Sequence, residues 1–316
     1  MRILITGGTG FVGGRLVDKL VANGHDVILG TRNGSKNFGW LKNLKTEKIS
    51  WENPYLLQKL CSGIDVVIHA AGMNAEDCAS DPQAAHLFNG VSTGRLAVAA
   101  ARAHVEKFIY LSTAHVYRSP LLGVIDEHTL PENSHPYAAS KLAGEIAAME
   151  AGRLGAIKVN VLRLSNVFGR PINRNVNCWM LVVQDLCRQA IEKKQMKLRN
   201  SGQKRDFVAM SEVCSVMEKL IVRNYMQKDE NIFNVGTGMS QSVLEIANVI
   251  RARCIELLGF APEIDCNDFS SNNLTHLHYK TDRLSLIRFR FDTNALITEL
   301  DSLIMFCVRE FGEQNT

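Results

Sequence analysis

The sequence lacks the features that mark several classes of protein. Its 316 residues contain no run of five or more Lys or Arg, and the net charge is only +4, so we expect no basic surface for nucleic acid. No apolar run approaches the roughly 18 residues of a membrane span, and no basic segment followed by an apolar one opens the chain. These absences predict a soluble, cytoplasmic protein without nucleic-acid or membrane partners.

Paired cysteines are also missing. None of the eight cysteines forms a C-x-x-C, and no His accompanies them at metal-ligand spacing, which argues against a zinc site or a disulfide framework. We therefore expect reduced, mostly buried thiols in an intracellular protein, and no metal. They stand at positions 61, 78, 178, 187, 214, 254, 266 and 307.

The first half of the chain alternates short apolar, β-branched runs with helix-like stretches. Near-continuous apolar strands separated by helices predict a parallel sheet covered on both faces, the doubly wound α/β (Rossmann) fold. The predicted strands are 2–6, 26–30, 47–50, 65–69, 107–112 and 158–163. The predicted helices are 11–23, 54–61, 83–104 and 137–153.

The alternation stops near residue 165, and the length favours about two domains. Residues 170–178 and 265–276 are polar and irregular, as surface loops are. We predict a Rossmann domain over 1–165, to which 206–238 returns. A smaller C-terminal substrate-binding region would then comprise 166–205 and 239–316.

A glycine-rich segment, TGGTGFVGG at 6–14, follows the first strand and opens a helix. Small residues here make a tight turn and let the backbone approach a pyrophosphate, while the helix N-terminus presents free N–H groups. A lone glycine triplet is weak evidence, but its place between a strand and a helix predicts dinucleotide binding rather than a merely flexible turn.

The end of the second strand discriminates between the two nicotinamide dinucleotides. A carboxylate there would bind the ribose 2′-hydroxyl of NAD, but no acid occurs from Ile28 to Lys36. Thr31, Arg32, Asn33, Ser35 and Lys36 offer donors and positive charge instead. Arg32 would pair with a 2′-phosphate, so NADP(H) is favoured over NAD(H); the alternative is that Arg32 is a solvated surface residue.

Tyr137 and Lys141 lie four residues apart after Pro136, a residue suited to a helix start, and so share one helix face. A free Tyr titrates near ~10, but a neighbouring ammonium and an oxidised nicotinamide would favour the phenolate. Such a group can take or give a hydroxyl proton during hydride transfer. By itself, however, Y-x-x-x-K is common on helix surfaces.

Taken in order, the motifs resemble those of the extended short-chain dehydrogenase/reductases. The matching segments are the glycine loop, HAAG at 69–72, Asn89, LSTAHVY at 111–117, Tyr137-x-x-x-Lys141, LRLSNVFG at 162–169, SGQKRDFVAMSEV at 201–213 and IFNVGTGMSQSVLEIA at 232–247. The resemblance covers about residues 1–255 and is closest to the branch that acts on nucleotide sugars.

The resemblance implies a set of site residues. Thr113, Tyr137 and Lys141 would be catalytic, with the Thr113 hydroxyl also binding the substrate, and Asn166 and Arg205 would hold the substrate diphosphate. The cofactor contacts would come from Gly7, Gly10, Phe11, Val12, Gly13, Arg32, Ala70, Ala71, Gly72, Asn89, Tyr137 and Lys141. A purely helix-packing role for Asn89 is equally open, and Arg205 has the alternative of an ion pair with Asp206 or another acid.

The residues after Thr113 narrow the reaction. The 4,6-dehydratases that the family contains carry Asp-Glu there, whereas this chain has Ala114 and His115. The resemblance therefore favours a nucleoside-diphosphate-sugar 4-ketoreductase or 4-epimerase over a dehydratase. A non-catalytic NADP(H) sensor or scaffold, or a reductase of steroids or flavonoids, are the other readings. Two Ala-rich helices, 83–104 and 137–153, would form the core of a homodimer, as in the family.

Overall fold

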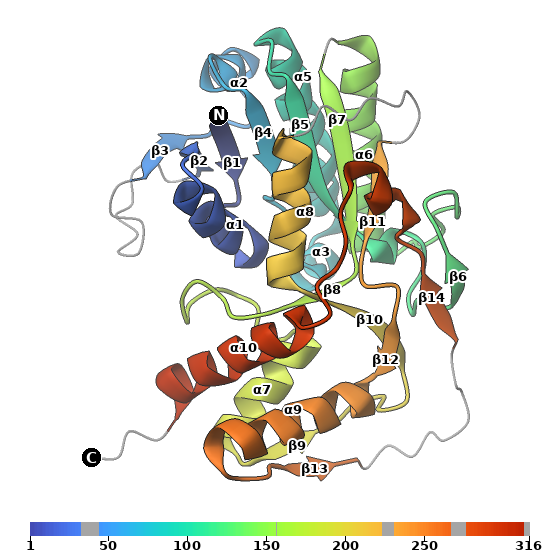
Figure 1. Ribbon diagram of the computed structural model, residues 1–316. Coiled ribbons are helices and arrows are strands. Elements are labelled where there is room, and N and C mark those ends of the chain that lie inside the picture. The colour runs from blue at the N-terminus through green and yellow to red at the C-terminus, as the bar shows by residue number, and fades with distance from the viewer. Residues whose placement is uncertain (33–43, 156, 223–230, 267–275, 313–316) are drawn as a thin grey trace. The chain divides into compact units, whose positions relative to one another are not determined.

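The computed structural model describes residues 1–32, 44–155, 157–222, 231–266 and 276–312, and they form two compact units (Figure 1). The first unit comprises 1–120, 129–164 and 218–233, and the second comprises 121–128, 165–217 and 234–316. The chain therefore leaves the first unit briefly after residue 120, again after residue 164, and finally after residue 233.

The elements of the first unit alternate as a doubly wound fold requires. They are β1 (Arg2–Thr6), α1 (Phe11–Ala22), β2 (Asp26–Thr31), β3 (Lys45–Lys48), α2 (Pro54–Cys61), β4 (Val66–His69), α3 (Ala75–Ser80), α4 (Pro82–Ala85), the π-helical η1 (His86–Ser92), α5 (Thr93–Arg102), β5 (Lys107–Thr113), the 3₁₀ turn η2 (Ala114–Val116), α6 (Pro136–Leu154) and β7 (Lys158–Leu164). Helix α8 (Met210–Val222) and strand β11 (Ile232–Val235) run between the units.

A seven-stranded, mostly parallel sheet in the order β11-β7-β5-β4-β1-β2-β3 forms the centre of this fold. One face packs on α2, α5 and α6 through a core that includes Leu4, Val67 and Phe108, while α1 lies on the opposite face (Figure 1). The strand order reverses between β1 and β4, so the loops after these two strands meet at the topological switch point. The doubly wound fold that the sequence predicted is confirmed.

The local predictions differ from the structure at two places. The third strand is β3 at 45–48, two residues before the predicted range. The single helix predicted over 83–104 is instead α4, η1 and α5 in succession. Gly90 and Gly94 lie there against α6, where a Cβ would come within 3.2 Å of Ala143 Cβ and 3.0 Å of Ala147 Cβ. Close helix packing on α6 thus accompanies the π-helical turn.

The second unit contains shorter strands and an apolar core of its own. Its elements are β6 (Gly123–Ile125), β8 (Asn166–Phe168), α7 (Val182–Glu192), β9 (Gln195–Lys197), β10 (Lys204–Ala209), β12 (Ser240–Ser242), α9 (Val243–Leu258), β13 (Glu263–Asp265), β14 (Leu277–Tyr279), the 3₁₀ helix η3 (Asp282–Ile287) and α10 (Ala295–Phe311). Sheets β12-β10-β8, β13-β9 and β14-β6 are small, and α7, α9 and α10 close around buried residues such as Leu186, Ile246 and Leu303.

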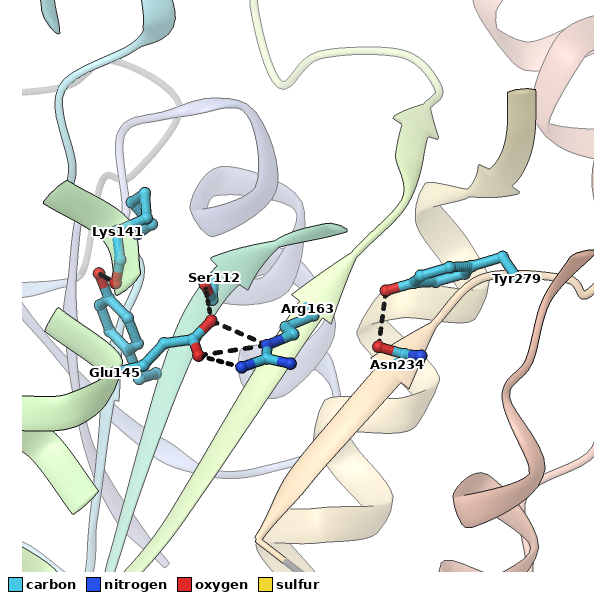
Figure 2. A network of polar contacts seen from close by, with 7 residues as sticks. Ser112, Lys141, Glu145, Arg163, Asn234 and Tyr279 are labelled. Atoms are coloured by element: carbon cyan, nitrogen blue, oxygen red, sulfur yellow. Dashed lines mark hydrogen bonds and ion pairs between the residues drawn. The ribbon is translucent and has the colours of Figure 1, made fainter. Parts of the chain in front are cut away.

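Two loops and one buried pair complete the second unit. Residues 170–178 are irregular, as predicted, whereas most of the predicted loop 265–276 lies outside the described residues. The Tyr279 hydroxyl donates to Asn234 Oδ1 at 2.9 Å, which joins β14 to β11 (Figure 2). The second unit is thus held together by buried side-chain contacts and its helical core, whereas its strands are short.

The described residues contain no disulfide, no metal-binding cluster and no membrane-spanning helix. All eight cysteines are without disulfide partners, and seven of them are buried. Within the described ranges, no set of three or more His, Cys, Asp or Glu is arranged to hold a metal ion. Nor does any helix in the described part of the chain combine the length and apolar character needed to cross a bilayer.

Candidate active site

The glycine loop is tightly closed against the end of β4. Gly7 has φ of +73°, and a Cβ there would lie 2.5 Å from the backbone nitrogen of Ala71. A Cβ at Gly13 would overlap the Gly7 carbonyl, whose oxygen accepts the Gly10 N–H at 2.9 Å. Only glycine fits these positions, and the loop therefore brings Ala70, Ala71 and the start of α1 together.

Helix α1 begins at Phe11 with no side-chain cap on its first turn. The free backbone N–H groups of residues such as Phe11 and Val12, with the helix dipole behind them, favour an anion such as a pyrophosphate. The closely packed glycine loop and the start of α1 thus fit a dinucleotide. The fit rests on the same residues that the sequence singled out.

The second strand ends at Thr31, and Arg32 follows it as an exposed residue. No carboxylate stands between Ile28 and Arg32. Asn33, Ser35 and Lys36, which the sequence also suggested as donors to a 2′-phosphate, lie outside the described residues.

Asn89 joins the loop after β4 to the helix that carries Tyr137 and Lys141. Its Oδ1 accepts the Met73 N–H at 2.9 Å, and its Nδ2 donates to Ser140 Oγ at 3.0 Å. A Cβ on Gly72 would lie 3.3 Å from Asn89 Oδ1 and 3.6 Å from Lys141 Nζ. The structure therefore brings Gly72, Asn89 and Lys141 together, and π-helical turns such as that of Asn89 are frequent at functional sites.

The Thr113 and Tyr137 side chains lie near each other. Thr113 is the last residue of β5, and its Oγ1 accepts the His115 N–H at 3.2 Å. Burial raises the pKa of Tyr137 to about 12, and the Thr113 hydroxyl acts in the opposite direction. The two hydroxyls that would handle a substrate proton are thus close together.

Lys141 is buried one helical turn beyond Tyr137. Its Nζ donates to the Leu111 carbonyl at 2.6 Å and lies 4.2 Å from the centre of the Tyr110 ring. Burial lowers the pKa of Lys141 to about 8, whereas the carboxylate of Glu145 and the Cys78 thiol act to raise it. At neutral pH the side chain is therefore an ammonium held over the Tyr110 ring.

Three residues that the sequence did not single out support this arrangement. Glu145 is the next residue along the face of Tyr137 and Lys141, and it binds Arg163 of β7 and Ser112 of β5 (Figure 2). Tyr137, Lys141 and Glu145 follow one another at intervals of four residues, and this spacing is the signal by which Glu145 could have been found.

A buried histidine, His69, links the ends of β1 and β4 to the start of α5. Thr6 Oγ1 lies 2.6 Å from His69 Nδ1, and His69 Nε2 lies 2.9 Å from Thr93 Oγ1. Burial, with a smaller effect of Lys141, lowers the pKa of His69 to about 3, so the ring is neutral. Since the Thr93 hydroxyl donates to the Asn89 carbonyl, His69 Nε2 is the donor and Nδ1 accepts from Thr6.

The two proposed diphosphate-binding residues lie in the second unit, on neighbouring strands. Asn166 begins β8 and donates its side-chain amide to the Asp206 carbonyl at 3.0 Å. Arg205, on β10, contacts Gln203 Oε1 at 2.8 Å, and within the described residues no carboxylate forms a salt bridge with it. Burial lowers the pKa of Arg205.

The alternative of an Arg205–Asp206 ion pair is not what the structure shows. The Asp206 carboxylate instead accepts from Ser165 Oγ at 2.7 Å, from the backbone N–H of Thr237 at 3.0 Å and from that of Gly238 at 2.8 Å. Asp206 therefore fixes two turns, and the Arg205 guanidinium is left without an anionic partner in the described chain.

The residues after Thr113 carry no carboxylate. Ala114 is buried and His115 lies in the 3₁₀ turn η2, where its carbonyl accepts from Asn133 Nδ2 at 2.7 Å. Arg118, which follows this segment, forms an exposed ion pair with Glu132 at 2.5 Å.

Comparison with known proteins identifies the family. The profile of the NAD dependent epimerase/dehydratase family matches residues 3–236. The chain belongs to this family. The match confirms the resemblance to the extended short-chain dehydrogenase/reductases, and with it an enzyme that uses a pyridine nucleotide.

Relatives of both reaction types are similar to the chain. A putative UDP-glucose 4-epimerase of Methanocaldococcus jannaschii is 29% identical over 256 residues, which cover 79% of this chain and 81% of that protein. The dTDP-D-glucose 4,6-dehydratase of Homo sapiens is 26% identical over 261 residues, covering 78% and 72%.

Solved structures share the fold at lower identity. The UDP-N-acetylglucosamine 4-epimerase of Methanobrevibacter ruminantium, in complex with UDP-N-acetylmuramic acid, aligns with a TM-score of 0.81 at 21% identity over 98% of both chains. MoeE5 in complex with UDP-glucose and NAD aligns with a TM-score of 0.78 at 22% identity, over 99% of this chain and 100% of that one.

Proposed function

We propose that the protein is an NADP(H)-dependent oxidoreductase of nucleoside-diphosphate sugars, a 4-epimerase or a 4-ketoreductase. The observation that carries the proposal is that Thr113 lies near enough to Tyr137 to act on its pKa, with the Lys141 ammonium one helical turn along α6. This set can exchange a proton with a sugar hydroxyl or carbonyl while a hydride is transferred.

The glycine loop and helix α1 would hold the cofactor pyrophosphate, with Gly7, Gly10 and Gly13 giving the close approach. Gly72, near both Asn89 and Lys141, would border the nicotinamide end of the site. When bound, the nicotinamide would accept or supply the hydride. Asn89 would keep Ser140 and the loop after β4 in place.

Each catalytic side chain then has a separate task. The Tyr137 phenol would donate its proton to the sugar oxygen in reduction and accept one in oxidation, while the Thr113 hydroxyl hydrogen-bonds the same oxygen. The charge of Lys141 would stabilise a phenolate at Tyr137, as a cation on the same helix face can. Replacement of Lys141 by a neutral residue would remove that effect.

The preference for NADP(H) is supported by the lack of an acid at the end of β2 together with the exposed Arg32 after it. A carboxylate there would repel a 2′-phosphate, whereas a guanidinium pairs with it. MoeE5 is described in complex with NAD, so a preference for NADPH would distinguish this chain from that structural neighbour.

The nucleotide-sugar substrate is supported by Arg205. A partly buried guanidinium without a carboxylate partner is costly unless a ligand supplies the anion, and a diphosphate does so in a bidentate geometry. Asn166, fixed to the carbonyl next to Arg205, would bind the same group. In this division of tasks, the first unit binds the cofactor and the second binds the substrate.

Water loss is disfavoured although dehydratases are among the relatives. Dehydration requires an acid and a base next to the catalytic threonine, and Ala114 and the His115 side chain supply no carboxylate pair. A non-catalytic sensor is disfavoured because Thr113, Tyr137 and Lys141 are all present.

We also propose a homodimer formed by η1, α5 and α6. Their exposed side chains include Leu87, Val91, Val98 and Ile146, which is 62% exposed. An apolar patch on packed helices would be covered by a second copy. Sedimentation of the protein and of Ile146→Glu tests this, and a monomeric wild type would contradict it.

The assay that tests the reaction is incubation of the protein with UDP-, GDP- and dTDP-sugars, screened first by thermal shift with NADPH present. Products followed by NMR should be a C4 epimer, or a C4 alcohol formed from a keto sugar with oxidation of NADPH. A 4-keto-6-deoxy product would contradict the proposal and assign a dehydratase.

A further inference from the structure

A buried ion pair lies directly behind the proposed catalytic lysine. Glu145 is 1% exposed and Arg163 is 3% exposed. Arg163 Nη2 donates to Glu145 Oε2 at 2.7 Å, and its Nε lies 3.1 Å from Oε1, so the contact is bidentate. Ser112 donates its hydroxyl to the same carboxylate (Figure 2). Replacing such a pair by apolar residues is often neutral or stabilising, so its presence calls for a reason other than stability.

The pair connects the elements that carry the catalytic groups. Glu145 is on α6, four residues after Lys141, and Ser112 directly precedes Thr113 on β5. Arg163 is opposite Ser112 in the β5–β7 register, and its guanidinium lies 4.7 Å from the ring centre of Tyr117. The helix of Tyr137 and the strand end of Thr113 are thus joined through one carboxylate.

We propose that Glu145 is a positioning residue for proton transfer: it supplies the counter-charge of the Lys141 ammonium and, through Ser112 and Arg163, anchors the Thr113 end of β5 to α6. This role rests on the proposed function of Lys141 and Tyr137. The direction of the electrostatic effect agrees, since the Glu145 carboxylate acts to raise the pKa of Lys141 against burial.

The other groups around Lys141 do not change charge near neutral pH. The titratable and charged side chains facing it, apart from Glu145, are His69 on β4, Cys78 on α3, Tyr110 on β5, Tyr137 on α6 and, behind Glu145, Arg163 on β7. Burial lowers the pKa of His69 to about 3, and burial raises the pKa values of the Cys78 thiol and of both tyrosines.

Arg163 is a permanent cation beside Glu145. Burial acts to lower the pKa of Arg163, but hydrogen bonds and the charge of Glu145 outweigh it and raise that pKa above its usual value. Arg163 therefore remains a cation, paired with Glu145 through two contacts.

The test compares Glu145→Gln with Glu145→Asp and with Arg163→Lys as a matched control that keeps every charge. The pH profile of kcat/KM should fall as pH rises through about 8 in the wild type, because Lys141 loses its proton. In Glu145→Gln this alkaline limb should move to lower pH by about one unit, since the counter-charge is lost. Glu145→Asp and Arg163→Lys should leave it in place, although both lose some activity.

A merely structural pair would give a different result. Glu145→Gln and Arg163→Lys would then lower activity without moving the limb, and that outcome would overturn the proposal. If Glu145→Gln alone does not fold, the double variant Glu145→Gln/Arg163→Met removes both buried charges. The limb should still move to lower pH, but by less than in Glu145→Gln, because the Arg163 cation is lost as well.

A second readout separates this role from the proposed function. Lysine labelled with ¹³C at Cε reports the Lys141 titration in the protein without substrate, and Lys141→Arg identifies its signal. The titration midpoint should be lower in Glu145→Gln than in the wild type by about one unit. An unchanged midpoint overturns the role of Glu145, whereas a wild type that titrates as expected but turns over no nucleotide sugar contradicts only the proposed function.

Discussion

Two arginines, the buried Arg163 in the first unit and the partly buried Arg205 in the second, have opposite surroundings. Arg163 is held by both oxygens of Glu145, and the ion pair raises its pKa. Arg205 contacts only the neutral amide of Gln203 among its described partners, and burial lowers its pKa. The first charge is compensated within the chain, whereas the second is not. A compensated charge organises the protein around it, and an uncompensated one is suited to an anion from outside.

The same contrast extends to the acids of the two units. Glu145, which lies one helical turn after Lys141 on α6, forms an ion pair with the side chain of Arg163. Asp206, next to Arg205, is satisfied by hydroxyl and backbone donors and does not neutralise its neighbour. Sequence adjacency therefore does not pair Arg205 with Asp206, and the Arg205 guanidinium has no carboxylate partner among the described residues.

The largest expected effect is on the stability of the first unit. Arg163→Ala would leave the Glu145 carboxylate buried without its cation, and loss of one partner of a buried pair costs about 3–5 kcal/mol of unfolding free energy. Urea denaturation measures this. Arg118→Ala is the control, because its exposed pair with Glu132 contributes no more than about 1 kcal/mol. Equal losses in the two variants would contradict the contrast between them.

Arg205→Ala should affect ligand binding instead of stability. Loss of a charge-assisted contact to a diphosphate costs about 2 kcal/mol, so the Kd for UDP, GDP or dTDP should rise by more than tenfold. Calorimetric titration measures the affinity, and the denaturation midpoint should stay close to that of the wild type. Unchanged nucleotide affinity together with reduced stability would place Arg205 with Arg163 as a structural cation.

A third arginine, Arg32, is exposed and has no partner among the described residues. Its replacement tests whether it binds the 2′-phosphate of NADP(H). The wild type should bind NADPH at least tenfold more tightly than NADH. Arg32→Ala should reduce the binding free-energy difference between the two cofactors by about 1–2 kcal/mol. Fluorescence titration of both reduced cofactors measures it. A preference of the wild type for NADH would remove the NADP(H) assignment while leaving the rest of the site intact.

The fold was largely predictable because its signals are local. Six strands and the helices between them follow from apolar runs and helical spacing, and the glycine loop follows from its place after β1. The break of 83–104 at η1 was not predictable, since it depends on the packing of Gly90 and Gly94 against α6. Contacts between distant segments leave no such pattern in one sequence.

The site was predictable in part for the same reason. Tyr137 and Lys141 share a helix face and could be paired from their spacing, and Glu145 continues that spacing. Its partner Arg163 is 18 residues away in the chain, and only the register of β5 on β7 brings it to Ser112 and Glu145. Similarly, Arg205 could be proposed from its motif, but its lack of a carboxylate partner is visible only in the folded second unit.

The central claim is that Tyr137 transfers the proton while the hydride moves. Tyr137→Phe removes only the hydroxyl, and kcat with the nucleotide sugar found in the screen should fall by at least about 10²-fold. The same sample should bind NADPH with the affinity of the wild type, because the cradle of Gly7, Gly10 and Gly13 is unaltered. Turnover close to that of the wild type would contradict the claim.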